Sequence, residues 1–316
     1  MMLRGLVSIF CILAATLPGT EADSGTDPVP GALPFFYGLH TFRGEGDSTT
    51  VVAAIAVPVR GLRRERVDNG VRYRFDVRFV LADTVRHSVV VTVDSVFASM
   101  PRPLARQHLL HTVVEVLAPP SRTTLQRVIV TDAARPGVGQ LYDSPFPIPD
   151  YSGTELMISD IAFGLPNAST GWTRRGITIA LLPTSQFPES SFDIYYEVYN
   201  LPAGTPYETE IAIAPVDEDD GEGHVVRILF AGESKALADD SFGELRRVES
   251  ALPKGRYRFT ITVKDEVSGQ TATRSRVVDV RGWGRGATLV PALPKRSRAE
   301  RAEPQRGDTA TSTSRR

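Results

Sequence analysis

One eight-residue run, from Phe192 to Tyr199, constrains the fold of this chain more than any other stretch. Its even-numbered positions are apolar: Phe192, Ile194, Tyr196 and Val198. Its odd-numbered positions carry carboxylates and tyrosines: Asp193, Tyr195, Glu197 and Tyr199. Because successive side chains on a strand point to opposite faces, the run predicts a half-buried β-strand with one apolar and one polar face.

Similar short strands recur along the whole chain, separated by turn residues. Those expected in the first half are 35–42, 49–59, 71–81, 85–96, 109–117 and 125–131. Those expected in the second half are 156–163, 176–182, 192–200, 207–214, 225–230, 255–263 and 271–280. The best helical pattern is the short stretch 103–111. The chain is therefore predicted to be all-β, with two tandem immunoglobulin-like β-sandwich domains.

Composition divides the chain, whose 316 residues are enough for two domains of about 150 residues each. We expect a signal peptide at 1–22, a linker at 23–33, a first β-sandwich at 34–142, a Pro-rich linker at 143–152, an immunoglobulin-like sandwich at 153–284 and a disordered basic tail at 285–316. Within the second sandwich, 166–175 is expected to be a loop.

The first residues resemble a secretory leader. Arg4 supplies a positive charge, 6–17 is an apolar stretch, and Thr20 and Ala22 offer small residues for cleavage. The apolar stretch is shorter than the roughly 20 residues that a membrane span needs. Cys11 is the single cysteine and lies in this segment, so the mature chain is expected to have no disulfide and no transmembrane span. The expected location is the periplasm, the outer envelope or the extracellular space; an uncleaved anchor or a mis-assigned start is the alternative.

The charge balance bears on the choice of partners. A formal net charge of −1 gives no overall attraction for nucleic acid, which we do not expect as a partner. The stretch from Pro294 to Arg316 has seven basic and three acidic residues, a net charge of +4. This tail could touch an anionic surface or polymer, although a solvated tail is the simpler interpretation.

A local pattern in the second half marks the entry to a strand. The segment 252–257 (LPKGRY) leads into the alternating run that ends at Asp265. It resembles the penultimate-strand entry of immunoglobulin-like and fibronectin type III domains, in which a tyrosine hydrogen-bonds back to upstream backbone. The resemblance gives Tyr257 that role, with Pro253, Gly255 and Asp265 as further structural residues. In the first half, the segment 120–132 is weakly similar to 253–265. It has the same length but no tyrosine.

A second resemblance covers roughly residues 151–280. The segments 159–161 (SDI), 196–202 (YEVYNLP) and 252–265 resemble the C-terminal β-sandwich region of exported bacterial GWxTD-domain proteins. The sequence departs from the motif that gives this family its name, because Gly171-Trp172-Thr173 has different spacing and no following aspartate. The resemblance implies an envelope or secreted β protein and carries over no activity.

Tyr195 and Tyr199 are the candidate binding residues. They lie on the polar face of the expected strand, beside Asp193 and Glu197. Exposed tyrosines in this position could stack on a sugar or meet a protein partner. The alternative is that this face packs against the neighbouring domain.

Two further segments have side chains that could hold a metal. His108 and His111 would share one face of a helix but lie on opposite faces of a strand, which favours a structural role. The acidic run 217–222 is rich in carboxylates, but its spacing differs from that of an EF-hand loop and favours a solvated hairpin tip. We therefore predict no metal site and no cofactor.

The sequence offers no catalytic residues that we can name. It has no Gly-x-Ser-x-Gly elbow, and its five histidines form no recognisable signature. We expect a non-catalytic protein with a structural or binding role in the bacterial envelope, whose partner is an envelope protein or a glycan. A secreted hydrolase, a glycosidase or protease accessory, remains the alternative, because the separation of paired carboxylates is a spatial property. The oligomeric state is left open.

Overall fold

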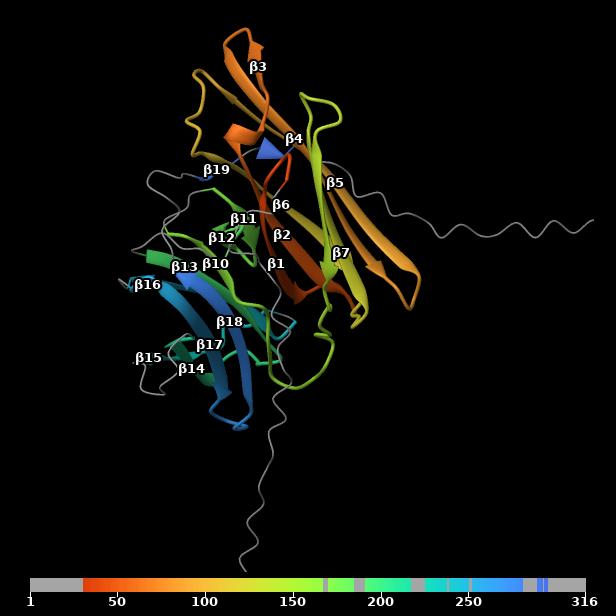
Figure 1. The fold of residues 1–316 in the computed structure, drawn as a ribbon. Helices are drawn as coiled ribbons and strands as arrows, with labels where there is room; N and C mark the ends of the chain where they lie inside the picture. The colour runs from red at the N-terminus through yellow and green to blue at the C-terminus, as the bar shows by residue number, and fades with distance from the viewer. Residues whose placement is uncertain are drawn as a thin grey trace, which may run out of the picture.

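The computed structural model describes residues 31–166, 170–184, 191–216, 225–237, 239–249, 252–280, 289–291 and 293–294. Within these residues the chain is nearly all β-strand, and its one helical segment is the short 3-10 turn η1 (Val59–Gly61). No described residue belongs to a helix that is long and apolar enough to span a membrane. Figure 1 shows the strands gathered into two bodies, the first of which carries β3 at its far end. The all-β prediction is confirmed.

The first sandwich consists of two sheets. One has the order β1-β2-β6-β19, with strands β1 (Phe36–Arg43), β2 (Thr49–Pro58), β6 (Leu109–Ala118) and β19 (Leu289–Pro291). The other has the order β20-β5-β4-β7-β8, with strands β20 (Leu293–Pro294), β5 (Ser88–Met100), β4 (Gly70–Asp83), β7 (Thr124–Asp132) and β8 (Gly139–Pro145). The short strand β3 (Arg64–Val67) pairs with β4 to form a hairpin.

The second sandwich also has two sheets. The sheet nearer the first sandwich has the order β11-β12-β10-β13-β16, with strands β11 (Trp172–Arg174), β12 (Ile177–Leu181), β10 (Ala162–Leu165), β13 (Ser191–Tyr199) and β16 (Ser241–Glu249), while β9 (Met157–Ile158) also pairs with β13. The other sheet has the order β15-β14-β17-β18, with strands β15 (Val226–Glu233), β14 (Pro206–Pro215), β17 (Gly255–Asp265) and β18 (Thr271–Val280).

Strand β4 follows the alternation that its sequence predicts. Its odd-numbered residues from Val71 to Leu81 are buried in the first core, and its even-numbered residues lie toward solvent. Tyr73, Phe75 and Phe79 fill the space between the two sheets. A strand that buries every second side chain in this way gains hydrophobic stabilisation from one of its two faces.

Strands β2 and β13 are instead buried on both faces. Val51 and Ile55 of β2 belong to the first core, whereas Val52 and Ala54 face the second sandwich. On β13 the even-numbered residues lie in the second core, and Tyr195 on the odd face joins Val52 and Ala54. The prediction that β13 is half-buried is therefore wrong, because the sheets of the two sandwiches stack on each other and cover its polar face.

Besides two short strands near the C-terminal end, β19 and β20, the described residues contain four strands beyond those expected: β3, β8, β11 and β16. β11 lies within the expected loop 166–175, where Trp172 is buried against the first sandwich. β8 occupies the start of the expected linker 143–152, and Phe146 and Ile148 are buried in the first core. The first sandwich thus extends past residue 142, because these apolar side chains complete its core.

The chain ends fall largely outside the described residues. The expected leader, most of the 23–33 linker, the acidic run 217–222 and most of the tail cannot be compared with the structure. Within the stretch expected to be a disordered tail, however, Leu289–Pro291 pairs in parallel with β6 and Leu293–Pro294 pairs antiparallel with β5. Backbone hydrogen bonds to these two strands order a segment that its composition alone does not.

The strand entry at Tyr257 has the predicted hydrogen bond. The Tyr257 hydroxyl donates to the carbonyl oxygen of Pro253 at 3.1 Å, and Gly255 opens β17 between them. At the other end of the strand, Asp265 accepts hydrogen bonds from the Val267 N–H at 2.8 Å and from the Ser268 hydroxyl. Side chain–backbone hydrogen bonds of Tyr257 and Asp265 thus lie at the two ends of one strand.

We expect Tyr257→Phe to lower the free energy of unfolding by about 1 kcal/mol, because it removes one side chain–backbone hydrogen bond. Urea denaturation measures this change. Tyr142→Phe is the matched control, since Tyr142 packs on Tyr37 through its ring, with the ring centroids 5.1 Å apart. An equal loss of unfolding free energy in both variants would show that the Tyr257 hydroxyl contributes no specific stabilisation.

Candidate functional site

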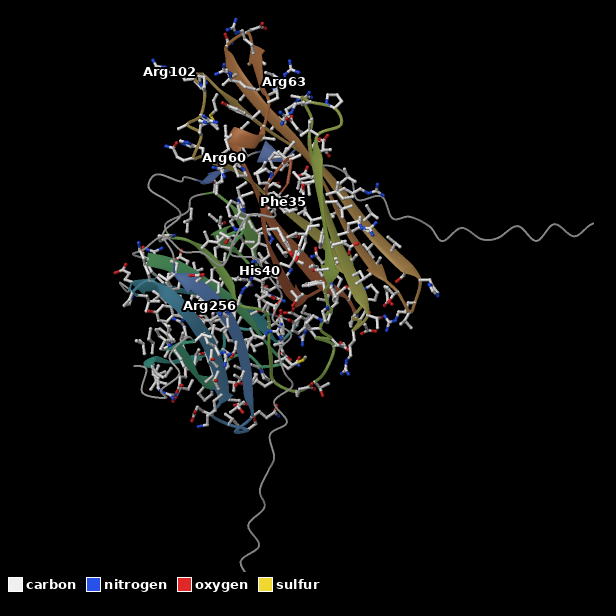
Figure 2. The ribbon with its side chains drawn as sticks, viewed as in Figure 1. Phe35, His40, Arg60, Arg63, Arg102 and Arg256 are labelled. Atoms are coloured by element: carbon white, nitrogen blue, oxygen red, sulfur yellow. The ribbon has the colours of Figure 1, made fainter. Side chains whose placement is uncertain are left out.

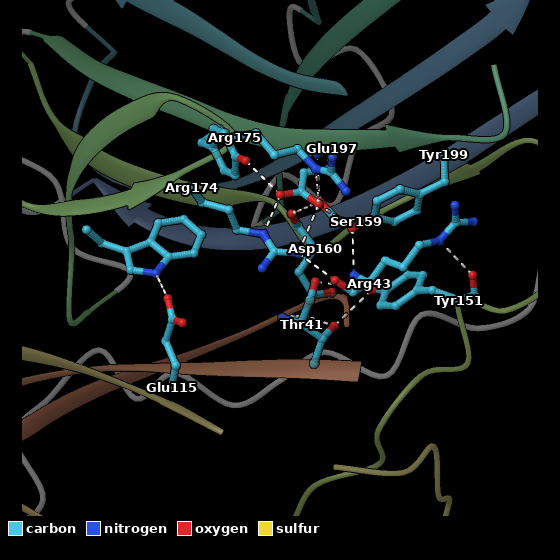
Figure 3. Close-up of polar contacts among 12 residues, drawn as sticks. Thr41, Arg43, Glu115, Tyr151, Ser159, Asp160, Arg174, Arg175, Glu197 and Tyr199 are labelled. Carbon is cyan, nitrogen blue, oxygen red and sulfur yellow. Dashed lines mark hydrogen bonds and ion pairs between the residues drawn. The ribbon is translucent and has the colours of Figure 1, made fainter. Parts of the chain in front are cut away.

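A group of polar residues, buried or half-buried, lies where the end of β1 meets the second sandwich (Figure 3). We call it the interdomain cluster, and it comprises His40, Thr41, Arg43, Tyr151, Ser159, Asp160, Arg174, Arg175, Tyr195, Glu197, Tyr199, Arg274 and Arg276. Buried charges are costly unless they are paired and hydrogen-bonded, so the partners of each charge show what the cluster does.

Asp160 connects the two sandwiches directly. Its Oδ2 accepts hydrogen bonds from the Thr41 N–H at 2.8 Å and from the Thr41 hydroxyl at 2.6 Å. The Asp160 N–H donates in return to the Thr41 carbonyl oxygen at 3.1 Å. Its other oxygen pairs with the guanidinium of Arg274 on β18. Asp160 therefore joins β1 to both sheets of the second sandwich.

Glu197 is the most buried charge of the cluster, with no exposed surface. The hydroxyls of Tyr195 and Tyr199 donate to its two oxygens at 2.7 and 2.9 Å. Arg174 forms an ion pair with the same carboxylate, and the Nε of Arg175 lies 3.2 Å from its Oε2. This second contact is not aligned as a hydrogen bond, so we regard it as electrostatic alone.

Ser159 fixes the backbone around this carboxylate. The Glu197 N–H donates to the Ser159 hydroxyl at 2.8 Å, and the Ser159 N–H donates to the Glu197 carbonyl oxygen at 2.9 Å. Because Asp160 follows Ser159 directly, this short connection links the two buried carboxylates through adjacent residues.

Arg43 carries the network back to the first sandwich. Its N–H donates to the Tyr199 hydroxyl at 2.8 Å, and its guanidinium lies over the Tyr199 ring, 4.4 Å from the centroid. The same guanidinium donates to the Tyr151 carbonyl oxygen at 3.0 Å and to the Asn200 side chain at 2.9 Å. The Arg43 carbonyl oxygen accepts a hydrogen bond from Arg174. Both the backbone and the side chain of this residue thus contact the second sandwich.

His40 lies on the same strand and meets Arg276 of β18. The Nδ1 of His40 and an Arg276 nitrogen are 2.7 Å apart, and because arginine is only a donor, His40 must accept through a neutral ring. Burial, together with the positive charge of Arg276, holds the pKa of His40 well below its ordinary value. Burial also lowers the pKa of Arg276 to about 10, so that it stays protonated at neutral pH.

The ionisation states of the other members fit their contacts. Burial opposes the ionisation of Asp160, but Arg274 and the Thr41 hydrogen bond outweigh it and lower its pKa. Burial raises the pKa of Tyr199 well above its ordinary value, and the neighbouring Glu197 adds to the effect. The carboxylate of Asp160 is thus charged, and the Tyr199 hydroxyl remains a donor.

An apolar layer surrounds the cluster. Phe42, Trp172 and Tyr195 stack near one another, with ring centroids 5.1 to 5.7 Å apart. The Trp172 indole N–H donates to Glu115 on β6, which adds a further polar link between the sandwiches. Water is thereby kept from the buried charges, which strengthens their electrostatic interactions.

The two candidate binding residues lie inside this layer. Tyr195 and Tyr199 are fully buried, so the expectation that they form an exposed, sugar-stacking face is wrong. The alternative is what the structure has: the face packs against the neighbouring domain. One sequence signal points to it, namely the nearly unbroken apolar run of β2, which leaves no polar face for water.

The histidine pair does not form a site. His111 is buried in β6, whereas His108 lies in the preceding turn with its ring near the Ala105 carbonyl oxygen. Across the described residues there is no group of three or more His, Cys, Asp or Glu arranged to hold a metal. In the interdomain cluster both carboxylates are surrounded by donors of the protein itself. That arrangement suits the fixing of one domain against another.

We expect Glu197→Gln to lower the free energy of unfolding by about 3–5 kcal/mol, because it leaves the largely buried Arg174 guanidinium without its counter-charge, whereas Arg175 keeps Asp239. Urea denaturation measures the loss, and small-angle X-ray scattering of the folded variant reports whether the sandwiches separate. Glu210→Gln is the control, since Glu210 pairs with Arg227 at the surface, where a pair contributes less than about 1 kcal/mol. Equal losses in the two variants would contradict the special role of Glu197.

We expect the stability of the protein to fall as the pH drops below about 6.5. His40 and His111 are buried, and burial lowers the pKa of His111 to about 4. Below pH 6.5 the unfolded chain therefore binds protons that the folded chain does not. The free energy of unfolding then falls by up to about 1.4 kcal/mol per pH unit for each histidine.

His40→Gln tests this dependence, because glutamine keeps an acceptor for Arg276 and does not titrate. Urea denaturation between pH 7.5 and 4.5 should give a shallower slope for this variant than for the wild type. His87→Asn, in the exposed β4–β5 turn, should leave the slope unchanged. Parallel slopes for His40→Gln and wild type would show that His40 is not the buried neutral group described above.

Comparisons with known proteins give no family for this chain. No family model matches it, and no curated protein matches it significantly. Among solved structures, Bacteroides uniformis β-glucuronidase is 10% identical, with a TM-score of 0.27 over 74% of this chain and 26% of that chain. Red sea bream transglutaminase is 11% identical, with a TM-score of 0.19 over 80% of this chain and 32% of that chain. The chain thus spans about a third or less of the proteins it matches, and we assign no function from similarities of this size.

Proposed function

We propose that this chain is an exported, non-catalytic β-sandwich protein with a structural or binding role in the bacterial cell envelope. The leader-like segment 1–22 supports export. The resemblance of 151–280 to the sandwich region of GWxTD-domain proteins supports an envelope location. Neither depends on the distant structural similarities.

The observation that carries the structural role is the pairing of Thr41 with Asp160. The two residues exchange hydrogen bonds between the sandwiches, and Asp160 is at the same time paired with Arg274. A buried carboxylate held from both sides disfavours rotation of one domain against the other, because rotation would expose or unpair it. Two sandwiches fixed in this way form one rigid body, which suits a spacer or a platform for partners.

A binding role would use surfaces outside the interdomain cluster. Tyr195 and Tyr199 are occupied between the sandwiches. The partner we propose, an envelope protein or a glycan, must then meet the outer faces or the ends of the molecule.

Expression of the complete chain in a Gram-negative host tests the envelope assignment. We expect the protein in the periplasmic or outer-membrane fraction, with an N-terminus near Asp23 by intact-mass measurement. A variant that begins at Asp23 after an initiating methionine is the control and should stay in the cytoplasm. Recovery of the complete chain from the cytoplasm with Met1 still present would contradict the proposal.

A further inference from the structure

One end of the first sandwich is unusually rich in arginine. Four segments meet there: η1 with residues 62–63, the β3–β4 hairpin, the turn 101–108 and the turn 132–138. We call this the arginine end, and its arginines are Arg60, Arg63, Arg64, Arg66, Arg72, Arg74, Arg102, Arg106 and Arg135. Figure 2 shows Arg60, Arg63 and Arg102 toward the end of the sandwich that carries β3, away from β14, β15 and β17.

Hydrogen bonds hold these four segments together. The Val59 N–H donates to the His108 carbonyl oxygen at 3.0 Å, and the Leu104 N–H donates to the Tyr73 hydroxyl at 3.2 Å. The Arg135 guanidinium donates to the Gly61 carbonyl oxygen at 2.8 Å. The arginines therefore stand on backbone that is fixed by contacts between segments distant in sequence.

The charge of this end is unbalanced. Its nine arginines face three acidic residues, Glu65, Asp68 and Asp132, which gives a net charge of +6 in a chain whose total is −1. Glu65 is paired with Arg74, and Asp132 with Arg135. The remaining acidic residue, Asp68, is exposed in the hairpin turn.

Seven of the nine arginines form no ion pair with an acidic residue within the described part of the chain. Of these, we use Arg64, Arg66 and Arg102 below, and all three are exposed. A guanidinium presents a rigid fork of donors that matches carboxylate and phosphate groups in a bidentate manner. A concentration of such groups attracts a ligand that carries several negative charges.

The register of the hairpin shows how the charges are arranged. Arg64 pairs with Tyr73 and therefore lies on the same face as that buried ring, as does Arg66 two positions on. Arg72 and Arg74 point to the opposite face of the same hairpin. Positive charge is thus present on both sides of the hairpin, with Glu65 offsetting Arg74 on the second side.

This arrangement favours a flexible polymer over a membrane surface. A flat bilayer meets one face of a hairpin, whereas a polymer can follow arginines around it. The exposed large apolar side chains of the described residues all lie outside this end, so it offers no side chain that would insert into lipid. Of the aromatic rings at this end, Tyr73 is buried, and Phe97 is half-buried beneath the Arg72 guanidinium, so neither offers an open face on which nucleic-acid bases could stack.

We propose that the arginine end binds an acidic polysaccharide through its carboxylate or phosphate groups. The proposal names the class of partner for the envelope role. It rests on the proposed envelope location, because that is where the protein would meet such a polymer. Binding by the purified protein is independent of export, so the two proposals fail separately.

Titration of the purified protein with polygalacturonate tests the proposal, with neutral dextran as the uncharged polymer. We expect binding at low salt that weakens as salt increases, because the contacts are electrostatic. The variant Arg64→Ala/Arg66→Ala/Arg102→Ala should lower the affinity by at least about tenfold, given the usual strength of charge-assisted hydrogen bonds.

The matched control is Arg78→Ala/Arg122→Ala/Arg127→Ala. It removes the same charge from exposed positions on the same sandwich but outside the arginine end, and should change the affinity less than about threefold. Thermal unfolding should show that both variants remain folded. Equal losses in the two variants, or no binding of polygalacturonate at low salt, would overturn the proposal. Tighter binding of phosphatidylglycerol vesicles or duplex DNA, with the same dependence on Arg64, Arg66 and Arg102, would also overturn it.

Discussion

A buried carboxylate needs donors on every side, and in this protein that requirement couples the two sandwiches. Glu197 has no exposed surface and is met by two tyrosine hydroxyls and two guanidinium groups. Removing such a charge from water costs several kcal/mol, which only close and well-placed partners offset. One of those partners, Tyr199, is itself held by the Arg43 N–H of the first sandwich. The position of Glu197 therefore depends on both domains at once.

The stacking of sheets follows from the same interface. Val52 and Ala54 on the outer face of β2 meet Ala162 and Tyr195 on the outer face of the second sandwich. Small side chains on β2 let the sheets approach closely, while the tyrosine places its ring in the apolar layer and its hydroxyl on Glu197. Four sheets are thus stacked in sequence, and the two inner ones are covered on both faces.

The protein has two groups of charged residues, and they differ in how their charges are neutralised. The charges of the interdomain cluster are neutralised internally and fix the relative position of the domains. The charges of the arginine end are mostly exposed and in excess, and Arg64 and Arg102 form no ion pair among the described residues.

The sequence by itself determined the strands whose two faces differ. Alternation identified β4 and β17, turn residues identified the hairpins, and the pattern around Tyr257 identified a hydrogen bond that the structure contains. β16 was not predicted, because Gly243 and the charged residues after it interrupt the apolar alternation. This strand lies at the edge of its sheet. Only the tertiary structure decided what covers the polar face of β13. Asp160 finds Thr41 across 119 positions and Tyr199 finds Arg43 across 156, and no local pattern records a partner so far away. A carboxylate beside two tyrosines is compatible with exposure to water or with a buried hydrogen-bond network. Which of the two environments it has depends on whether another domain supplies donors that offset the cost of burial.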